Sequence, residues 1–458
     1  MEAEAEVIQR CHYWLSKKNR FCANSPITNS QFCGNHNPKS DEQRIPCPID
    51  PSHTVLQGNI DAHAKRCPFL KQDQSLRMQP FFKEGINAGT DDDQKDKESV
   101  VTTASMKRDY VFKMSVLEFV GLIKKIELIH KSLCLNLQDS YKIREACREW
   151  MNEEINGKLP FQEKHVLQQA SILGNLEEFG VLETPEKRSA SMDGSMGSDE
   201  AIPAVVEFGA GRGYLTQMLA DCYGIRKVFL VERRSYKLKA DRSLRQKESL
   251  VLERLRIDIE DLDLNSMETL SAAPYLAIGK HLCGPATDLT LRCSLRKQCM
   301  QSKTVCTSNT SNLRGLAIAA CCHHLCQWKH YINKNYLSNL GIKKEEFHAV
   351  TWFTSWAVDA DHGSDLSNMV ERESSLDSII SISGKSSHHM DAGSVEEIVR
   401  TIPAVERAAL GFMCKDIIDI GRLMWLKDLG LEAELVKYVP SNISPENHLL
   451  IAKSCNYS

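Results

Sequence analysis

The chain has 458 residues, of which 42% are hydrophobic, 26% charged and 7% aromatic. These values are ordinary for folded proteins and exclude a wholly disordered, collagenous or fibrous chain. At roughly 150 residues per domain, the length predicts about three folded units. No run of about 18 apolar residues occurs, and the first residues (MEAEAEVIQR) are acidic where a secretory signal is basic and then apolar. We therefore expect an intracellular protein, in the nucleus or the cytoplasm, that neither spans a membrane nor is secreted by the usual route.

The net charge of −3 hides three acidic stretches. Residues 84–106, 183–200 and 359–398 carry net charges of −4, −3 and −7, and all three are rich in Ser, Gly or Asp and poor in large apolar side chains. We expect the first two to be linkers and the third to be an acidic, Ser-rich insertion in a folded domain. Without these stretches the chain carries +11. That charge favours a polyanionic partner, although a scattered, solvated surface explains it equally well.

The remaining sequence divides into a Cys- and His-rich start, a helical segment and a long α/β region. Small modules are expected at 1–40 and 44–71, apolar stripes of helical period mark 107–182, and strands alternate with helices over 201–458. The chain has 17 cysteines. Without a signal peptide, these fit metal ligation or buried thiols better than disulfides.

The first cluster of possible metal ligands is regularly spaced. Ten residues separate Cys11 from Cys22 and Cys22 from Cys33, and two separate Cys33 from His36. Zinc prefers four such ligands in a tetrahedron, so we predict a CCCH zinc module; the alternative is four unrelated residues of a Cys-rich chain. The loops between the ligands suit contact with single-stranded nucleic acid or its backbone. The residues concerned are Trp14, Lys17, Lys18, Arg20 and Phe21.

A second cluster follows, formed by Cys47, His53, His63 and Cys67. It contains a Cys-x5-His pair and a His-x3-Cys pair, and the second pair lies one helical turn apart. A module of roughly 30 residues buries too little apolar surface to fold alone, so bound zinc would supply the missing stability. Its segments CP-x-DPSH and H-x3-CP resemble the CHHC zinc finger of a minor-spliceosome protein and of certain tRNA methyltransferases. The resemblance implies an RNA-linked zinc module.

The α/β region opens with a glycine-rich turn between a strand and a helix. In AVVEFGAGRGYLTQML, Glu207 precedes Gly209, Gly211 and Gly213. This G-x-G-x-G spacing is typical of the nucleoside-binding loops of S-adenosylmethionine (SAM) methyltransferases, whereas dinucleotide-binding loops carry G-x-G-x-x-G. Glu232 lies nineteen residues after Gly213 and closes the next strand. A carboxylate at that place can accept hydrogen bonds from both ribose hydroxyls of the cofactor.

Later strands extend the same pattern. A third strand ends near Asp258, the usual place of a contact to the adenine amino group, and further strands are PYLAIGKHLCG, GLAIAACCHHL, EAELVKYV and HLLIAKS. The last two can form an antiparallel hairpin that completes a seven-stranded sheet. We expect an α/β, Rossmann-like SAM-methyltransferase domain; the alternative is an unrelated Rossmann-like fold. Ligands of open α/β sheets bind beyond the carboxyl ends of the strands. Lys280, His281 and Cys283, together with the run 321–324, should therefore line the mouth of the cofactor site.

Three longer motifs carry a closer resemblance. KHLCGPATDLTLRC, AACCHH and RAALGFMCKDIIDIGR, with the glycine loop and both zinc clusters, resemble the eukaryotic tRNA ribose 2′-O-methyltransferases that modify nucleotide 4 of the acceptor stem. The resemblance spans the start of the chain and most of 201–458. It implies SAM as the methyl donor, zinc in both modules and tRNA as the partner. The implied acceptor is the 2′-hydroxyl of a cytidine or adenosine at nucleotide 4, in tRNAs such as those for proline, glycine and histidine.

Such a reaction needs a proton acceptor near the ribose. A hydroxyl is a poor nucleophile until a base takes its proton or a cation stabilises the alkoxide. Lys280 or His281 could do either, and His323 is the next candidate for the catalytic base.

One helix could also contact the RNA. The segment AVERAALGFMCKDIIDIGR places Arg407, Gly411, Lys415 and Asp419 at successive i, i+4 positions. Arg407 and Lys415 are expected to grip RNA phosphates, with Gly411 allowing close approach and Asp419 orienting Lys415. A surface ion-pair stripe explains the spacing equally well.

Two other functions have to be weighed. A cytosine-5 RNA methyltransferase would use a cysteine nucleophile such as Cys283, Cys321 or Cys322, but such enzymes carry Thr-Cys-Pro and Pro-Cys signatures, and neither occurs in 201–458. A non-catalytic zinc-finger RNA-binding protein would not need the intact glycine loop, Glu207 and Glu232. Binding of SAM would distinguish this last possibility from an enzyme.

Overall fold

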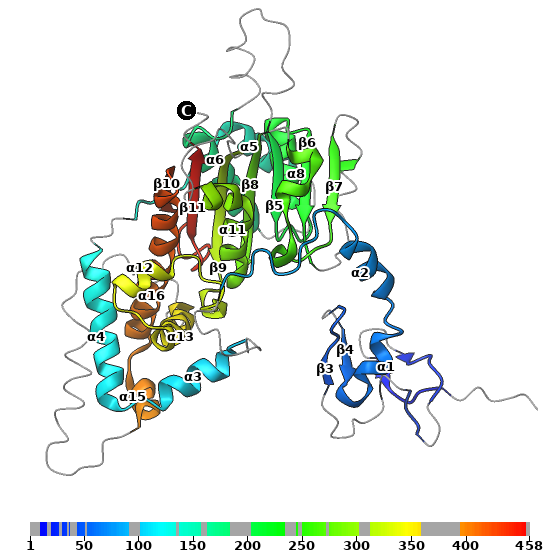
Figure 1. Ribbon diagram of the computed structural model, residues 1–458, viewed down its shortest axis with the longest axis horizontal. Coiled ribbons are helices and arrows are strands. Elements are labelled where there is room, and N and C mark those ends of the chain that lie inside the picture. The colour runs from blue at the N-terminus through cyan, green and yellow to red at the C-terminus, as the bar shows by residue number, and fades with distance from the viewer. Residues whose placement is uncertain are drawn as a thin grey trace, which may run out of the picture. The chain divides into compact units, whose positions relative to one another are not determined.

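The computed structural model describes residues 10–15, 20–26, 30–33, 36, 44–50, 53–90, 101–133, 137–156, 163–183, 203–233, 244–245, 250–271, 274–301, 312–358 and 394–454. The chain separates into two compact units, which we call the head (Met1–Met78) and the main unit (Gln79–Ser458) (Figure 1). Parts of three expected segments lie outside the described residues. They are 91–100 of the first linker, 184–200 of the second linker and 359–393 of the insertion.

The head contains two short hairpins followed by helices. Its elements are β1 (Trp14–Leu15), β2 (Arg20–Phe21), β3 (Arg44–Pro46), β4 (Thr54–Leu56), η2 (Gln57–Asn59), α1 (Ile60–Ala64) and α2 (Leu70–Arg77). Strands β1 and β2 pair antiparallel, as do β3 and β4. Among the residues described in the head, the buried apolar side chains form two small clusters, and all but one of them are cysteines. Cores this small cannot stabilise a fold by burial alone, which is the condition in which a bound metal becomes necessary.

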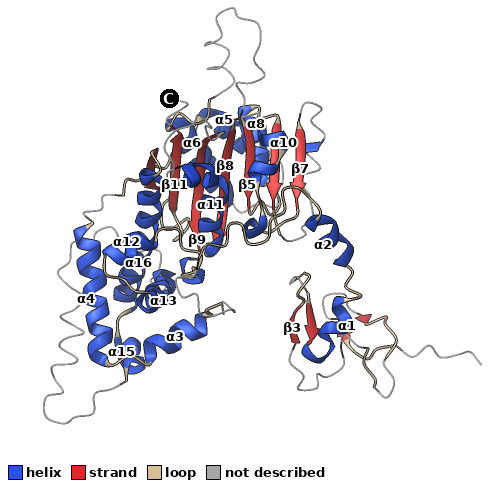
Figure 2. Ribbon diagram, viewed as in Figure 1, coloured by secondary structure: helices blue, strands red, loops and turns tan. Residues whose placement is uncertain are grey.

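The main unit is built on a seven-stranded sheet (Figure 2). Its strands are β5 (Ala204–Phe208), β6 (Lys227–Val231), β7 (Val251–Leu255), β8 (Tyr275–Cys283), β9 (Leu313–Cys321), β10 (Leu431–Lys437) and β11 (His448–Ser454). They lie in the order β10-β11-β9-β8-β5-β6-β7. Strands β5 to β9 pair in parallel, and β11 runs antiparallel to both β9 and β10. The prediction of a seven-stranded sheet completed by an antiparallel hairpin is confirmed.

Helices cover both faces of this sheet. The elements are α5 (Glu145–Asn156), α6 (Glu163–Glu178), α8 (Tyr214–Tyr223), η4 (Ile259–Asp261), η5 (Leu264–Ser266), α10 (Glu268–Ser271) and α11 (Pro285–Gln301). Because successive strand residues point to opposite faces, Val205, Leu276 and Ala317 share one face, where they pack with α5, α6 and α8. Helix α11 contacts β8 and β9 and lies outside that core. All five residues of β5 are buried, as expected for a strand covered on both faces.

The order of strands reverses next to β5. The chain passes from β5 outward to β6 and β7 and then returns to the other side of β5 as β8. Crevices at the carboxyl ends of strands at such a reversal are the usual ligand sites of open α/β sheets. The loop after β5 and the carboxyl end of β8 meet there. A Cβ placed on Gly209 would lie only 2.9 Å from the Leu282 side chain.

A helical lobe packs beside the sheet, and Figure 1 shows early and late parts of the chain side by side in it. Its elements are α3 (Ala104–Phe112), α4 (Val116–Ser132), η6 (His323–Leu325), α12 (Lys334–Asn339), α13 (Lys344–Phe353), η7 (Thr354–Val358), α15 (Val395–Thr401) and α16 (Ala404–Asp428). Helix α4 packs on α16 and α3 packs on α13. The predicted helical segment 107–182 holds α4, α5, α6 and most of α3. Because α3 and α4 belong to the lobe whereas α5 and α6 cover the sheet, the segment is not a separate body.

The predicted linker 84–106 is folded at both of its ends, so its predicted bounds are wrong. Asn87 is fully buried, and its Nδ2 donates hydrogen bonds to the carbonyl oxygens of Ile259 and Leu262 at 2.7 and 2.8 Å. Arg292 donates back to the carbonyl oxygen of Asn87 at 2.7 Å. At the other end, Ala104 already begins α3. The partners of Asn87 lie more than 170 residues away in the chain. The acidic composition of 84–106 therefore gave no sign that Asn87 is buried.

Candidate active site and metal centres

The predicted glycine loop joins β5 to α8. Gly209, Gly211 and Gly213 have φ angles of 61°, 51° and 77°, a left-handed conformation that favours glycine. The N–H of Gly211 donates to Glu232 Oε2 at 3.1 Å, and its carbonyl oxygen accepts from Arg254 Nη1 at 3.1 Å. The nearest atom to a Cβ built on Gly211 is 3.9 Å away. The loop is therefore anchored from the ends of β6 and β7 and open on the side where Gly211 has no side chain.

Glu207 lies beneath this loop, in β5. It is buried and accepts hydrogen bonds from the backbone N–H of Thr216, at 3.2 Å, and from the Thr216 hydroxyl. Burial raises the pKa of Glu207 to about 7, although the bonds from Thr216 lower it. The side chain thus ties the end of β5 to the first turn of α8 and fixes the shape of the loop between them.

Glu232 and Asp258 lie at the carboxyl ends of β6 and β7. The backbone N–H of Glu232 donates to Leu255 at 3.0 Å, which keeps it beside β7. Asp258 accepts a hydrogen bond from the backbone N–H of Glu260 at 3.1 Å and pairs with Arg233 at 3.0 Å. Both carboxylates therefore already have partners in the protein, Gly211 for Glu232 and Glu260 and Arg233 for Asp258, and a nucleoside would have to share them.

Lys280 lies in β8 on the same face as Glu207. Its side chain is nearly buried, with 9% of the residue exposed, and Nζ donates to the carbonyl oxygen of His165 at 3.1 Å. Burial lowers the pKa of Lys280 to about 7, while the charge of Glu207 works in the opposite direction. An amine with such a pKa is available near neutral pH as a base and, when protonated, as a cation.

His281, the next residue, is exposed and has a φ of 62°. Its ring lies edge-on to the ring of His165, with the centroids 5.9 Å apart. Desolvation of the ring, with the charges of Lys280 and His165, lowers the pKa of His281 to about 4. It is therefore neutral at pH 7 and a weaker base than Lys280, but it can donate or accept a hydrogen bond at the site.

The structure contradicts the choice of His323 as a base. The residue is 1% exposed, with Nε2 2.8 Å from Asp419 Oδ2 and Nδ1 3.2 Å from Glu446 Oε2. Burial alone lowers the pKa of His323, but the two carboxylates outweigh it and leave the pKa raised. A buried imidazolium held by two carboxylates has no free lone pair, so His323 is a structural ion-pair residue.

The helix face expected to grip RNA is buried as well. Lys415 in α16 is 0% exposed; its Nζ donates to the carbonyl oxygen of Pro445 at 2.5 Å and pairs with Glu446 at 3.2 Å. A Cβ on Gly411 would lie 2.5 Å from the backbone nitrogen of Ala357. Gly411 therefore lets η7 approach α16, and Lys415 cannot reach a phosphate. The i, i+4 spacing defines a face but does not show whether that face points outward.

Asp419 was expected from the sequence to orient Lys415, but its side chain does not pair with that of Lys415. Its carboxylate accepts from both His323 and His448 at 2.8 Å and pairs with Arg422 at 2.8 Å. Arg407, at the start of α16, is half-buried and donates to the carbonyl oxygen of Ile402 at 3.1 Å. Contact between Arg407 and RNA stays a prediction.

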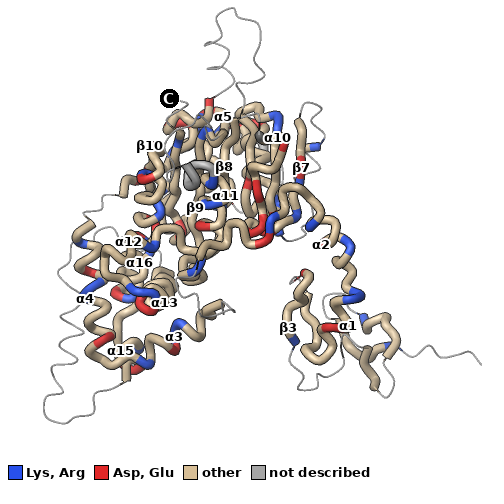
Figure 3. Tube along the Cα trace, in the orientation of Figure 1, with Lys and Arg blue, Asp and Glu red and all other residues tan. Residues whose placement is uncertain are grey.

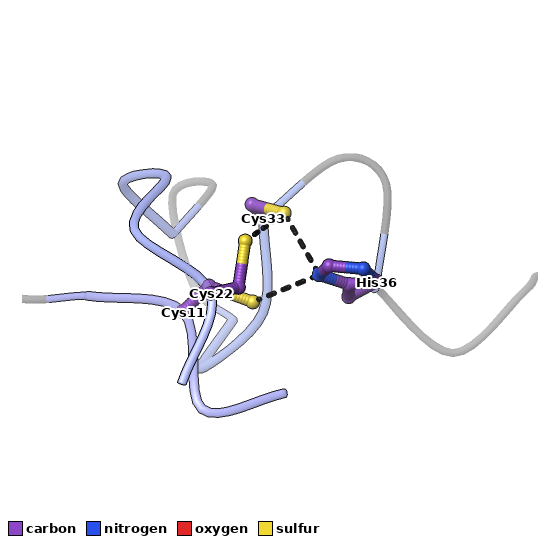
Figure 4. Close-up of side chains that lie close together, drawn as sticks. All are labelled: Cys11, Cys22, Cys33 and His36. Carbon is purple, nitrogen blue, oxygen red and sulfur yellow. Dashed lines mark hydrogen bonds between the residues drawn. The ribbon is translucent and has the colours of Figure 1, made fainter. Parts of the chain in front are cut away.

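The first four-ligand set of the head converges on one point (Figure 4). Nδ1 of His36 lies 3.5 Å from Cys11 Sγ and 3.4 Å from Cys33 Sγ, and the Sγ atoms of Cys22 and Cys33 are 4.0 Å apart. Ligands on a tetrahedral zinc ion with Zn–S bonds of about 2.3 Å are roughly 3.8 Å apart. The four side chains therefore fit a single zinc ion.

The second set fits in the same way. The Sγ atoms of Cys47 and Cys67 are 3.8 Å apart, and Nε2 of His63 lies 3.2 Å from Cys47 Sγ. Nε2 of His53 lies 3.7 Å from Cys67 Sγ and 2.9 Å from Nε2 of His63. In both His53 and His63, Nε2 is the nitrogen that faces the centre of the ligand set. This is a Cys₂His₂ arrangement typical of structural zinc.

Three family models match parts of this chain. A family model described as Methyltransferase TRM13 matches residues 167–453, more than half of the chain. A model described as the CCCH zinc finger in TRM13 protein matches 9–37, and one described as the U11-48K-like CHHC zinc finger matches 44–68. The chain belongs to the TRM13 methyltransferase family. The resemblance seen in the sequence is thereby confirmed.

Individual members of this family are similar over long stretches. The "tRNA:m(4)X modification enzyme TRM13" of Oryza sativa subsp. japonica is 50% identical over 240 residues, covering 50% of this chain and 91% of the relative. The "tRNA:m(4)X modification enzyme TRM13 homolog" of Mus musculus is 32% identical over 489 residues, covering 97% of this chain and 94% of the relative. The relative from Saccharomyces cerevisiae is 26% identical, covering 96% of this chain.

Membership in the TRM13 family makes SAM the methyl donor and zinc the metal of the two fingers. The residues present fit both, because the glycine loop is open beside Gly211 and the head holds two tetrahedral ligand sets. Within the part of the chain that the structure describes, no helix is both long and apolar enough to cross a membrane.

Three residues around the site were not found from the sequence. Arg254 holds the glycine loop from β7, His165 accepts from Lys280, and Glu446 joins His323 to Lys415. Of these three, Arg254 is the residue that the sequence could have indicated, because it is a charged residue inside a predicted strand. The other two act through contacts with remote segments and carry no local pattern.

Proposed function

We propose that this protein transfers the methyl group of SAM to the ribose 2′-hydroxyl of nucleotide 4, a cytidine or adenosine, in certain tRNAs. The observation that carries the proposal is similarity over 97% of the chain, both zinc modules included, to a relative named as a tRNA:m(4)X modification enzyme. The resemblance of its motifs to ribose 2′-O-methyltransferases specifies the acceptor atom. Because tRNA is made in the nucleus and used in the cytoplasm, the protein acts in one or both compartments.

The fold supports a Rossmann-like SAM-binding domain over 201–458. Five parallel strands carry the glycine loop at the point where strand order reverses, which is where a nucleoside binds in such sheets. The carboxylate of Glu232 would accept hydrogen bonds from the ribose hydroxyls of the cofactor, and Asp258 would lie near its adenine. The residues proposed to form the cofactor site are Glu207, Gly209, Gly211, Gly213, Glu232 and Asp258.

Lys280 is the proposed catalytic base. SAM, when bound, supplies a methyl group on a positively charged sulfur, and the chain has to supply an activated hydroxyl. In its neutral form, Nζ of Lys280 accepts the proton of the 2′-hydroxyl, and the resulting ammonium is stabilised by the buried carboxylate of Glu207. His281 is exposed and neutral, so it can hydrogen-bond to the ribose and orient it.

The head supplies a second contact to RNA. Tyr13, Trp14 and Phe21 are 46%, 46% and 58% exposed, and the rings of Trp14 and Phe21 meet edge to face at 4.9 Å. Exposed aromatic rings of this kind stack on unpaired bases. Figure 3 shows basic positions along α2, which contains Lys71 and Arg77. The modules 1–40 and 44–71 would thus hold tRNA while residues 201–458 carry out the reaction.

The proposal is tested by mapping the product. Full-length protein is incubated with SAM and unmodified tRNA transcripts, and the RNA is treated with alkali. A ribose methyl blocks cleavage of the bond after nucleotide 4, so a gap at that position is the expected result. A methylated base with normal alkaline cleavage would instead indicate the cytosine-5 reaction. Binding of tRNA without any methylation would indicate the non-catalytic function.

A further inference from the structure

Three thiols of the main unit lie together at the carboxyl ends of β8 and β9. Cys283 is the last residue of β8 and pairs in register with Cys321, the last residue of β9. Their Sγ atoms are 3.8 Å apart, and the Sγ atoms of Cys321 and Cys322 are 3.3 Å apart. All three are free cysteines. Within the described residues, the other Cys, His and carboxylate groups that converge as closely are the two zinc sets of the head.

The backbone around the thiols is strained. His281 and Cys322, with φ of 62° and 50°, are the two residues other than glycine that have a positive φ in the described part of the chain. The register of β8 against β9 shifts at His281, as in a bulge. At Gly284, with φ of 54°, a Cβ would lie 2.6 Å from Leu325. Strain of this kind persists only where the surroundings impose it, and it is concentrated at functional sites.

The three thiols also differ from the other cysteines in their access to solvent. Cys283 is exposed and Cys321 and Cys322 are half-buried, whereas the other described thiols of the main unit are buried. A buried single thiol behaves as a small apolar side chain. Accessible thiols side by side can instead react or bind a metal, so their juxtaposition needs a chemical explanation.

We propose that Cys283, Cys321 and Cys322 bind a third zinc ion through their thiolates. The 3.8 Å between the Sγ atoms of Cys283 and Cys321 matches neighbouring sulfurs of a tetrahedral zinc site and exceeds the roughly 2.05 Å of a disulfide. Thiolates are soft ligands that favour zinc over magnesium or calcium. Three protein ligands leave the fourth position for water, as in zinc sites that act on a substrate.

The proposed site shares no ligand with the two zinc fingers. It can therefore be tested without RNA or SAM, by counting zinc ions. Full-length protein expressed with zinc is weighed intact by native mass spectrometry, which counts bound ions. Wild type is expected to hold three zinc ions and Cys283→Ser two. Cys222→Ser, a matched replacement of a buried thiol in α8, is the control and should keep three. Because the count does not depend on methylation, it can succeed or fail independently of the proposed function.

Two results would overturn the proposal. One is an equal zinc count in wild type and Cys283→Ser. The other is a Cys283–Cys321 disulfide in freshly isolated protein, detected by peptide mapping without reductant. Cys283 is exposed, so Cys283→Ser should fold normally, with the thermal unfolding midpoint lowered only by the loss of the bound ion. Cys321→Ser is counted as well, and it too must lose one ion.

Discussion

The Nζ of Lys280 donates a hydrogen bond to the carbonyl oxygen of His165, which lies 115 residues earlier in the chain. The bond holds a nearly buried amine of β8 against α6 with a neutral partner. Within the described residues Lys280 has no ion pair, so burial controls its protonation and lowers its pKa to about 7. The amine is therefore placed to change charge in the range where the protein works.

We predict that the rate of methylation follows this titration. With a pKa near 7, about one Lys280 in ten is neutral at pH 6 and about nine in ten at pH 8. The single-turnover rate on bound tRNA should therefore rise about tenfold between these values. The charge of Glu207, whose own pKa is raised to about 7, acts on Lys280 and favours its ammonium form. Glu207→Gln should remove the carboxylate that favours the ammonium form and shift the rise to lower pH.

The variant Lys280→Met removes the proposed base and tests this assignment. Its rate should be low and independent of pH between 6 and 8, while tRNA binding measured by filter retention stays unchanged. A full rate in Lys280→Met, or a flat profile in the wild-type protein, would assign the proton transfer to another group, with His281→Ala tested next.

A second prediction concerns Glu232, which accepts from the N–H of Gly211. Glu232→Ala removes both this anchor and the acceptor proposed for the ribose hydroxyls. Each hydrogen bond to a charged group contributes about 1.5–3 kcal/mol, so affinity for SAM should fall at least tenfold. Calorimetry measures it, with Glu434→Ala on the exposed side of β10 as a control. Equal affinity in Glu232→Ala and Glu434→Ala would show that the nucleoside binds elsewhere.

A third prediction follows from the burial of Lys415. Lys415→Met removes the donor to the Pro445 carbonyl and leaves the Glu446 carboxylate with His323 alone. Breaking a buried pair costs about 3 kcal/mol. The free energy of unfolding, measured by urea titration, should fall by that amount. Lys427→Met, on an exposed part of α16, should change it by less than about 1 kcal/mol. Loss of tRNA affinity in Lys415→Met at unchanged stability would restore the phosphate-gripping role.

A fourth prediction concerns the exposed rings of the head. Stacking of one base on an aromatic side chain contributes about 1–3 kcal/mol. Trp14→Ala and Phe21→Ala should therefore each weaken tRNA binding by roughly 5- to 150-fold, with zinc content and SAM affinity unchanged. Fluorescence anisotropy with labelled tRNA measures the effect. The rings of β1 and β2 have no part in RNA binding if both variants keep wild-type affinity.

Local spacing predicted the parts of this protein that depend on neighbouring residues. The zinc ligands, the glycine loop and Glu232 lie within short motifs whose geometry follows from the residue types and their intervals. Prediction failed where the partner is remote in sequence. Lys415 is buried by residues 445–446 and Asn87 by residues 259–262, so neither the helical stripe nor the acidic composition could reveal the packing.

The methyl acceptor proposed for this protein is the 2′-hydroxyl of nucleotide 4. The most direct measurement uses two synthetic tRNAs, one with deoxyribose at nucleotide 4 and one with deoxyribose at nucleotide 5, incubated with the protein and labelled SAM. We expect methylation of the second tRNA at the rate of the all-ribose control and none of the first. Equal methylation of both would contradict it, because the methyl group would then have been transferred to an atom other than the missing oxygen.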